Sequence, residues 1–356
     1  MPVQPVDNLM RQAIAEKIFP GGVLLVSVNG SIIFFKAYGY ANLYSRVPVT
    51  QDTIFDLASL TKPLATALGV MMLVQREKIE LDNTLDMILP ESKYTDKAQV
   101  KVKHLLYHNS GLPDYRPYYK TLSRFPQKAR RKALRECLLK ETLVNPIGQK
   151  VVYSDLGFMI LAWVIEHVSG QRLDHFIAQE IYRPLGLHHL LFISSDTPLY
   201  EGLFAATENC RWRNMILEGR VHDENAYAVG GVEGHAGLFG NAENIHDLLY
   251  ALLSSYLGDT SYPLFQTALV RLFFKRLPHS DKALGFDTPS LRGSSCGSYF
   301  SKKSVGHLGF TGTSFWMDLD RKISVILLTN RIHPTRENNA IKAFRPELHD
   351  AVIKSI

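Results

Sequence analysis

Two pairs of β-prone runs lie near the two ends of the chain. In each pair a polar turn separates stretches rich in apolar residues, and the first turn, Asn29-Gly30, is typical of a tight hairpin. The predicted hairpin strands are residues 22–28, 31–38, 313–319 and 323–329. The pattern therefore predicts that the chain opens with an antiparallel pair and that a second pair follows near its end.

Between the hairpins, apolar positions recur mostly at helical spacing. Helices are predicted over residues 59–75, 103–108, 129–139, 155–168, 173–181 and 242–254, and an amphipathic helix over residues 345–356. This order indicates an α+β fold: one antiparallel sheet built from both chain ends and flanked by helices, beside a mainly helical lobe. We expect residues 1–58 and 285–356 to form the sheet region and residues 59–284 the helical region of one catalytic unit.

The composition is typical of a globular protein without a nucleic-acid partner and without a membrane span. The 356 residues are 46% hydrophobic, which is ample for a core, and no run approaches the roughly 18 apolar residues of a membrane span. The net charge of +6 is scattered over short runs such as Arg130-Arg131-Lys132, which is more typical of solvated helix faces than of a nucleic-acid surface.

The cysteines and the first residues bear on the compartment. Cys137, Cys210 and Cys296 are few and widely spaced, which argues against a disulfide framework and fits a reducing environment. The start of the chain lacks the basic and then apolar pattern of a signal peptide. We therefore expect a cytoplasmic protein, or a periplasmic or secreted one if a leader was removed.

Ser59 and Lys62 are the most informative pair of polar residues. Residues three apart on a helix share a face, so the Lys62 amine can reach the Ser59 hydroxyl and act as its base or proton relay if its pKa is depressed. The apolar run at residues 64–74 predicts a buried helix that shields the lysine. The alternative is a helix cap by Ser59 with Lys62 extending to solvent.

Two further segments offer polar groups beside predicted elements. Tyr153 and Asp155 stand at the start of the helix at residues 155–168, where the alternative is a core tyrosine with a capping aspartate. The segment from His307 to Thr313 leads into a predicted strand, and its glycines are typical of close approach by a ligand, although a simple turn is the alternative.

Taken together, these segments resemble the serine β-lactamase and penicillin-binding protein superfamily, in particular its branch of class C β-lactamases, D,D-peptidases and esterases. That branch has Ser-x-x-Lys, then Tyr-x-Asn, then Lys-Thr-Gly or a His-x-Gly variant. Ser59, Lys62, Tyr153, His307 and Gly309 stand in matching order, and residues 105–113 resemble the family's Leu-Leu-x-His-x-Ser-Gly-Leu segment. The resemblance spans about residues 22–330 and implies a β-lactamase-like fold.

The resemblance also implies roles for the site residues. Ser59 would be acylated, while Lys62 and Tyr153 share the proton transfers, and the backbone N–H groups of Ser59 and Phe310 would form the oxyanion hole. Residues expected to bind or select the substrate are Asp155, His307, Gly309, Thr311 and His235. The expected partner is a small-molecule or peptide substrate, and no cofactor or metal is expected.

Two departures from the family pattern bear on the substrate. Asp155 replaces an asparagine, and an ionised carboxylate cannot donate a hydrogen bond to a substrate carbonyl. It would also favour the ammonium form of Lys62 and disfavour a Tyr153 phenolate. His307 replaces a lysine and, when neutral, grips a carboxylate less firmly. Both changes point away from an efficient β-lactamase.

We therefore predict a serine hydrolase that acts through a covalent acyl-enzyme on an ester, an amide or a cell-wall-derived peptide. The alternatives are a D,D-carboxypeptidase or β-lactamase, and a catalytically silent protein that binds peptidoglycan fragments or serves as a scaffold.

The remaining histidines favour no metal site. His104 and His108 have helical i, i+4 spacing but lack the neighbouring glutamate of a zincin. The resemblance also implies that the glycine-rich stretch at residues 221–240 passes near the rim of the site, where its polar residues would shape substrate choice, although a purely structural loop is an alternative. They are His222, Asp223, Glu233 and His235.

Overall fold

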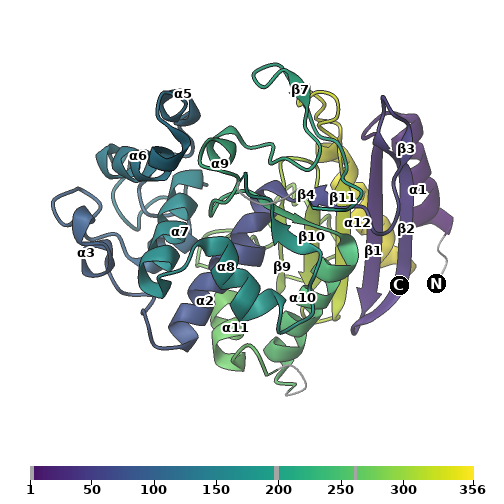
Figure 1. The fold of residues 1–356 in the computed structure, drawn as a ribbon. Helices are drawn as coiled ribbons and strands as arrows, with labels where there is room; N and C mark the ends of the chain where they lie inside the picture. The colour runs from purple at the N-terminus through teal and green to yellow at the C-terminus, as the bar shows by residue number, and fades with distance from the viewer. Residues whose placement is uncertain (1–3, 196–199, 260–262) are drawn as a thin grey trace.

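A six-stranded antiparallel sheet joins the two ends of the chain (Figure 1). The structure, a computed structural model, describes residues 4–195, 200–259 and 263–356. The strand order is β3 (Val47–Pro48), β2 (Ser31–Asn42), β1 (Gly21–Val28), β11 (Ile323–Thr329), β10 (Ser314–Asp318) and β9 (Ser304–Leu308). Both predicted hairpins are confirmed, and β1 pairs with β11 at the centre of the sheet. Strand β9, which carries His307, was not predicted as a strand.

Two helices cover one face of this sheet. Helix α1 (Gln4–Ala15) precedes the first hairpin, so the prediction that the chain opens with strands is wrong. Its buried residues Val6, Met10 and Ala13 recur at helical spacing, and the Tyr38 hydroxyl of β2 donates to Asp7 on α1 at 2.7 Å. Helix α12 (Ile341–Ser355) packs beside α1 on the same face (Figure 1).

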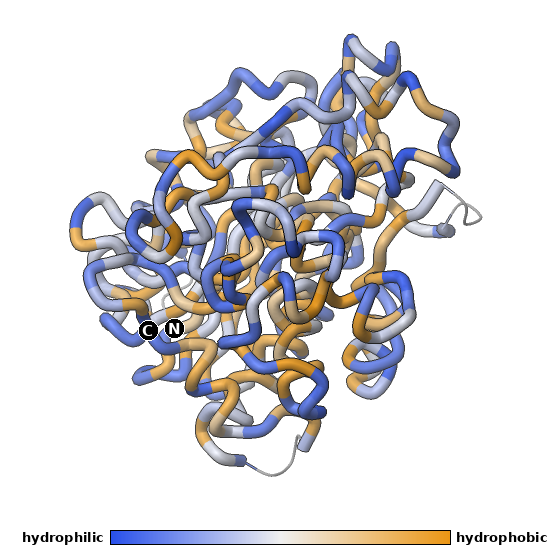
Figure 2. The backbone as a smooth tube through the Cα atoms, turned by 90° about the vertical axis from the view of Figure 1, so that its left-hand side faces the viewer, coloured by the Kyte–Doolittle hydropathy of each residue, from blue (hydrophilic) through white to orange (hydrophobic). Residues whose placement is uncertain are grey.

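The other face carries the helical lobe. Its central helix, α7 (Asp155–Ser169), is buried over ten consecutive residues and packs against α2 (Leu68–Gln75). Helix α10 (Ala242–Leu257) contacts β1 and β11. The other helices of the lobe are α3 (Leu85–Ile88), α4 (Val102–Leu106), α5 (Tyr119–Leu122), α6 (Gln127–Lys140), α8 (Leu173–Ile177), α9 (Glu224–Ala228) and α11 (Thr267–Phe273). In Figure 2, hydrophobic segments run through the middle of the molecule.

Short strands connect the lobe to the sheet. Strands β4 (Phe55–Asp56), β8 (Leu238–Gly240) and β5 (Leu190–Phe192) form a small sheet, and β6 (Asn209–Cys210) pairs with β7 (Met215–Ile216). Within the described ranges we find no helix that combines the length and apolarity needed to span a bilayer.

The predicted helix at residues 59–75 is not a continuous α-helix. A 3-10 turn at Ala58–Leu60 is followed by a π-helical turn at Lys62–Ala67, and α2 begins only at Leu68. Pro63 has no N–H to donate, which favours an altered hydrogen-bond pattern in this turn. A similar π-helical turn, Ala178–Tyr182, extends α8. The remaining 3-10 turn is Pro90–Ser92.

Candidate active site

A cavity of about 420 Å³ contains the Ser59 side chain. Its lining comes from distant parts of the sequence and includes Ser59, Tyr153, Asp155, His235, Phe310 and Arg336. The turn before α7, the loop before β8 and the turn after β9 thus all reach this cavity.

The backbone around Ser59 is tightly constrained. Ala58, directly before it, has a φ of +47°, which is uncommon for a residue with a side chain. The Asp56 carboxylate accepts the Ala58 N–H at 2.9 Å and the His222 N–H at 2.6 Å, so one buried carboxylate fixes this turn and the opposite wall. Ser59 caps neither of the two helical turns beside it.

Lys62 lies within hydrogen-bond distance of three acceptors. Its Nζ is 3.1 Å from Ser59 Oγ, 2.7 Å from Asp155 Oδ1 and 3.0 Å from the His235 carbonyl oxygen. Burial lowers the pKa of Lys62, but the Asp155 carboxylate and Tyr153 outweigh burial, and the net shift is upward. The resting site therefore holds an ammonium, so the condition that Lys62 has a depressed pKa is not met.

Tyr153 completes the cluster around the Ser59 hydroxyl. The Lys62 Nζ lies 4.8 Å from the centre of the Tyr153 ring, whose other neighbours include the His108 ring at 4.6 Å. The residue is 36% exposed. Desolvation raises the pKa of Tyr153, and the Asp155 carboxylate raises it further. Lys62 and the Ser59 hydroxyl lower this pKa but do not outweigh desolvation. The net upward shift makes Tyr153 a neutral phenol at pH 7.

Asp155 reaches Lys62 because another residue caps the helix. Ser154 is the N-cap of α7, and its Oγ accepts the Gly157 N–H at 3.3 Å. The capping alternative for Asp155 is therefore wrong, and its carboxylate pairs with Lys62 instead.

The turn after β9 is docked onto the backbone before Ser59. Thr311 Oγ1 donates to the Asp56 carbonyl at 2.6 Å, and Thr313 Oγ1 donates to the Leu57 carbonyl at 3.1 Å. Gly309 permits this approach, because a Cβ there would lie 2.6 Å from the Leu57 oxygen. Within the described parts of the chain, neither the Ser59 N–H nor the Phe310 N–H donates a hydrogen bond. Both amides are thus available to an oxyanion.

The residues predicted to bind substrate divide into two groups. Asp155 and His235 line the cavity, whereas His307, Gly309 and Thr311 are not among its lining residues. His307 is 2% exposed, and its Nδ1 donates to the Leu308 carbonyl at 2.9 Å. Burial is the main cause that lowers the pKa of His307 to about 4. It is therefore neutral at pH 7, and its ring lies 5.9 Å from that of Tyr153.

A buried histidine–aspartate pair adjoins Lys62. His235 Nε2 lies 2.8 Å from Asp223 Oδ1, and Asp223 also caps α9 by accepting the Ala226 N–H at 2.7 Å. Burial lowers the pKa of His235, but Asp223 outweighs burial and raises it overall. Among the described residues, His235 Nδ1 has no hydrogen-bond partner. Glu233, by contrast, is buried and accepts the Gly234 N–H.

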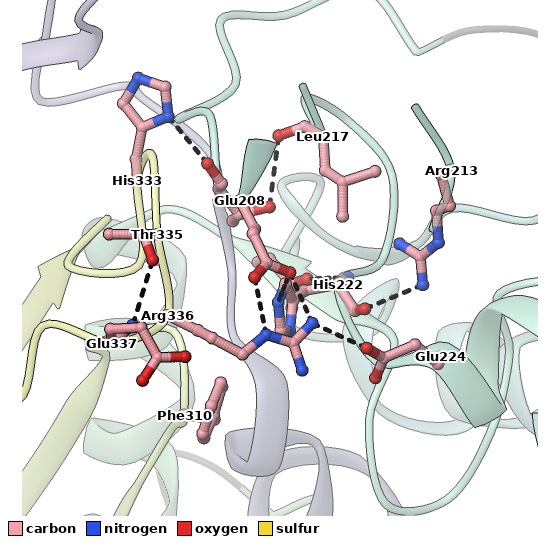
Figure 3. Close-up of polar contacts among 12 residues, drawn as sticks. Glu208, Arg213, Leu217, His222, Glu224, Phe310, His333, Thr335, Arg336 and Glu337 are labelled. Carbon is pink, nitrogen blue, oxygen red and sulfur yellow. Dashed lines mark hydrogen bonds and ion pairs between the residues drawn. The ribbon is translucent and has the colours of Figure 1, made fainter. Parts of the chain in front are cut away.

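A network of charges forms the rim of the cavity (Figure 3). The Arg336 guanidinium lies between two carboxylates, at 2.7 Å from Glu208 Oε1 and 2.7 Å from Glu224 Oε1. Glu208 also contacts His222 Nε2 at 3.1 Å, and the His222 ring stacks on Phe310 with centroids 5.6 Å apart. The sequence analysis missed Arg336, since no local pattern marks a single arginine after the last strand.

Lys282 was also missed. Its Nζ lies 5.7 Å from the centre of the Tyr153 ring and 2.6 Å from Asp287 Oδ1. Asp287 exchanges backbone hydrogen bonds with Gly306 of β9, which places this ion pair beside His307. Only the packing of this loop against β9 brings Lys282 to the site.

His104 and His108 do not converge on a common point. His104 Nδ1 accepts the Lys101 N–H at 3.1 Å, and His108 Nδ1 accepts the Ser154 N–H at 3.0 Å. In the ranges that the structure describes, no three His, Cys, Asp or Glu residues are grouped as metal ligands would be.

Comparison with known proteins gives one family and several close relatives. A family model described as Beta-lactamase matches residues 6–348. N-acetylmuramyl-L-alanine amidase of Bacillus subtilis (strain 168) is 35% identical over 367 residues, which cover 93% of this chain and 81% of the relative. A protein of Escherichia coli (strain K12), provisionally named D-alanyl-D-alanine carboxypeptidase, is 31% identical over 375 residues, covering 92% of this chain and 82% of that protein.

Solved structures show the same fold at lower identity. EstCE1, a hydrolase with promiscuous acyltransferase activity, superimposes with a TM-score of 0.78 at 23% identity, over 99% of this chain and 98% of its own. A penicillin-binding protein homologue from Pyrococcus abyssi gives a TM-score of 0.77 at 20% identity, over 99% of this chain and 78% of that chain.

Proposed function

Because this chain belongs to the Beta-lactamase family, whose β-lactamase and penicillin-binding protein types are serine hydrolases, we propose that it forms a covalent acyl-enzyme on Ser59. We further propose that it cleaves an amide bond in a cell-wall-derived substrate. The observation that carries the proposal is the 3.1 Å contact between Lys62 Nζ and Ser59 Oγ at a cavity. A catalytically silent scaffold has no use for this contact.

At rest both Lys62 and Tyr153 are protonated, and one of these two protons must leave before the reaction can begin. Lys62 and Tyr153 are close enough to titrate as a coupled pair, so loss of one proton from the pair creates the base. That base takes the Ser59 proton while Oγ attacks the carbonyl carbon. The N–H groups of Ser59 and Phe310 are the proposed donors to the oxyanion.

The amine then leaves with the proton that the pair took from Ser59, and the C–N bond breaks. The acyl group is now an ester of Ser59. A water molecule gives a proton to the same base and attacks this ester, and Ser59 Oγ recovers a proton as the acid product leaves.

The charges around the cavity favour an amide without an adjacent carboxylate. Four cations that line or adjoin it each have a carboxylate partner, whereas the guanidiniums of Arg213 and Arg331, which also lie beside it, donate to backbone carbonyls. The pairs are Lys62 with Asp155, His235 with Asp223, Lys282 with Asp287, and Arg336 with Glu208 and Glu224. D,D-Carboxypeptidase and β-lactamase substrates carry a carboxylate near the scissile bond, which needs a free cation.

The relatives' names agree with this choice in part. The relative that is 35% identical is named N-acetylmuramyl-L-alanine amidase. The relative that is 31% identical is named for D,D-carboxypeptidase activity, which is the second candidate function. We favour the amidase reaction because His307 is neutral and Lys282 is neutralised by Asp287.

Intact-mass measurement tests the acyl-enzyme. Wild-type protein is treated with a fluorophosphonate, and the adduct is located by peptide mapping. We expect one adduct on Ser59, none in Ser59→Ala, and labelling slowed at least about 10²-fold in Lys62→Ala. Lack of any adduct in the folded wild type would favour the silent alternative.

Parallel assays distinguish the substrates. Muramyl dipeptide, a D-Ala-D-Ala peptide, short acyl esters and nitrocefin are compared by kcat/KM. We expect the muramyl amide to be the best substrate and nitrocefin to be slow. A higher kcat/KM for the D-Ala-D-Ala peptide would move the assignment to D,D-carboxypeptidase.

A further inference from the structure

An exposed tryptophan lies beside the cavity, and the proposed reaction makes no use of it. Trp212, at the tip of the β6–β7 hairpin, is 46% exposed, whereas Trp163 and Trp316 are buried. An exposed large aromatic ring next to a cavity is typical of a binding surface.

Arg213 holds Trp212 in place against the cavity wall. The Arg213 guanidinium carbon lies 5.1 Å from the centre of the Trp212 ring and 4.1 Å from that of Tyr227. The same guanidinium donates to the carbonyls of Val221 and His222 at 2.8 and 2.9 Å (Figure 3). His222 lines the cavity, so the hairpin tip is tied directly to the cavity wall.

Aromatic surface continues from the tryptophan into the cavity. The rings of Tyr119 and Trp212 are 4.9 Å apart at an angle of 65°, and Tyr119 lines the cavity together with Tyr115. The Tyr119 N–H donates to Asn225 Oδ1 at 2.8 Å, which anchors α5 to α9. We name Tyr115, Tyr119 and Trp212 the aromatic shelf. It reaches the same space that contains Ser59.

The surroundings of the shelf match the chemistry of a sugar. A pyranose ring has C–H faces that stack on aromatic rings and an equator of hydroxyl and amide groups that form hydrogen bonds. Two charged residues, Glu224 and Arg336, line the same cavity as Tyr115 and Tyr119 of the shelf, and they offer hydrogen-bond partners to these groups. An apolar side chain would use the rings but leave these charges without new partners.

We propose that the aromatic shelf binds an N-acetylated sugar ring attached to the acyl side of the scissile amide. This inference rests on the proposed function for the position of the amide, but the contact between the sugar and Trp212 can be measured without catalysis. It makes Trp212 a specificity-determining residue for glycosylated acyl groups.

Binding is measured on the Ser59→Ala protein by calorimetry. The ligands are muramyl dipeptide and an analogue in which a methyl group replaces the sugar on the lactyl oxygen. We expect the sugar to tighten binding at least tenfold, and Trp212→Ala to remove that gain. Trp212→Phe should keep binding within about threefold. As a control, Tyr94→Ala removes a ring that is 92% exposed and outside the cavity lining, and it should change nothing.

Fluorescence gives an independent signature. Since Trp212 is the exposed one of the three tryptophans, the sugar-bearing ligand should shift its emission to shorter wavelength, and the analogue should not. Equal affinity for both ligands, or unchanged affinity in a folded Trp212→Ala protein, would overturn the proposal. If binding depends on Trp212 but wild type leaves the amide intact, the sugar site stands and the proposed reaction fails.

Discussion

At the residue scale, Asp155 controls the protonation of the whole site. It lies 2.7 Å from Lys62 Nζ, and it raises the pKa of both Lys62 and Tyr153. In place of the family's asparagine, this carboxylate keeps the pair fully protonated at rest. The proton that must leave the pair before Ser59 reacts is therefore held more tightly.

Asp155→Asn should make the enzyme reactive at lower pH. Removing the negative charge lowers the pKa of both members of the pair, so the rising limb of the pH–rate profile should move down by about 1 unit. The measurement is the rate of Ser59 acylation by an activated ester between pH 5 and 10. Asp52→Asn, an exposed aspartate outside the cavity lining, should leave the limb in place. An upward shift in Asp155→Asn would contradict this account.

Lys282→Met should shift the same limb in the opposite direction. The ammonium is 5.7 Å from the Tyr153 ring centre, and the interaction between the two groups favours the phenolate. Its loss should raise the limb by up to about 1 unit. The matched control is Lys303→Met, which breaks an exposed pair with Asp320. Identical profiles for wild type and Lys282→Met would limit Lys282 to a structural role.

At the element scale, the turn after β9 and the turn before Ser59 form one unit. The hydroxyls of Thr311 and Thr313 bind the two turns to each other, and Gly309 permits their close approach. The two unpartnered amides come from the two sides of this junction. Precise spacing of the junction is therefore the condition for an oxyanion hole.

Gly309→Ala should damage catalysis more than stability. The new Cβ would lie 2.0 Å from Thr313 Oγ1 and 2.6 Å from the Leu57 oxygen, so the two turns must separate. We expect the acylation rate to fall about 10²-fold, as for loss of one oxyanion donor. Gly157→Ala is the control, because its Cβ meets nothing closer than 3.7 Å. Thermal unfolding of both variants shows whether the fall in acylation rate is caused by misfolding alone.

At the scale of the whole molecule, the sheet separates two apolar cores. Successive residues of β1 alternate between them: Val23 and Leu25 face the helical lobe, while Leu24 and Val26 face α1 and α12. The cavity lies on the side of the lobe. The apolar packing under α12 should therefore contribute to stability without shaping the site, although Arg345 of the same helix donates to the Gly309 and Thr313 carbonyls of the turn after β9.

Leu348→Ala tests this separation. Leu348 on α12 is fully buried in the second core, so its truncation should lower the free energy of unfolding by about 2–5 kcal/mol. The kcat/KM of the folded protein should stay within about twofold. Urea unfolding and kinetics at 20 °C measure the two quantities. Leu291→Ala, at a position 90% exposed, should change stability by less than about 0.5 kcal/mol. A large loss of kcat/KM in folded Leu348→Ala would show that the cores are coupled.

Much of the architecture could be predicted because its signals are local. Alternation and an Asn-Gly turn predicted the hairpins, and the apolar run after Lys62 predicted a buried helix. The helix α1 was missed although Val6, Met10 and Ala13 carry the same kind of signal. The division into residues 1–58 with 285–356 and residues 59–284 stays a prediction, and parts of it (1–3, 196–199, 260–262) lie outside the described residues.

The sequence by itself determined the α+β class and the pairing of Ser59 with Lys62, because hairpin turns, helical periodicity and the Ser-x-x-Lys spacing are signals within a few neighbouring residues, and the resemblance of its motifs to a known superfamily added the β-lactamase-like fold. Only the tertiary structure decided the protonation of Lys62, the two carboxylates around Arg336, the position of Lys282 and the aromatic shelf. Each of these depends on charges or rings contributed by segments far apart in the chain. Electrostatic and stacking energies are set by distances in space, and spacing along the sequence does not specify those distances.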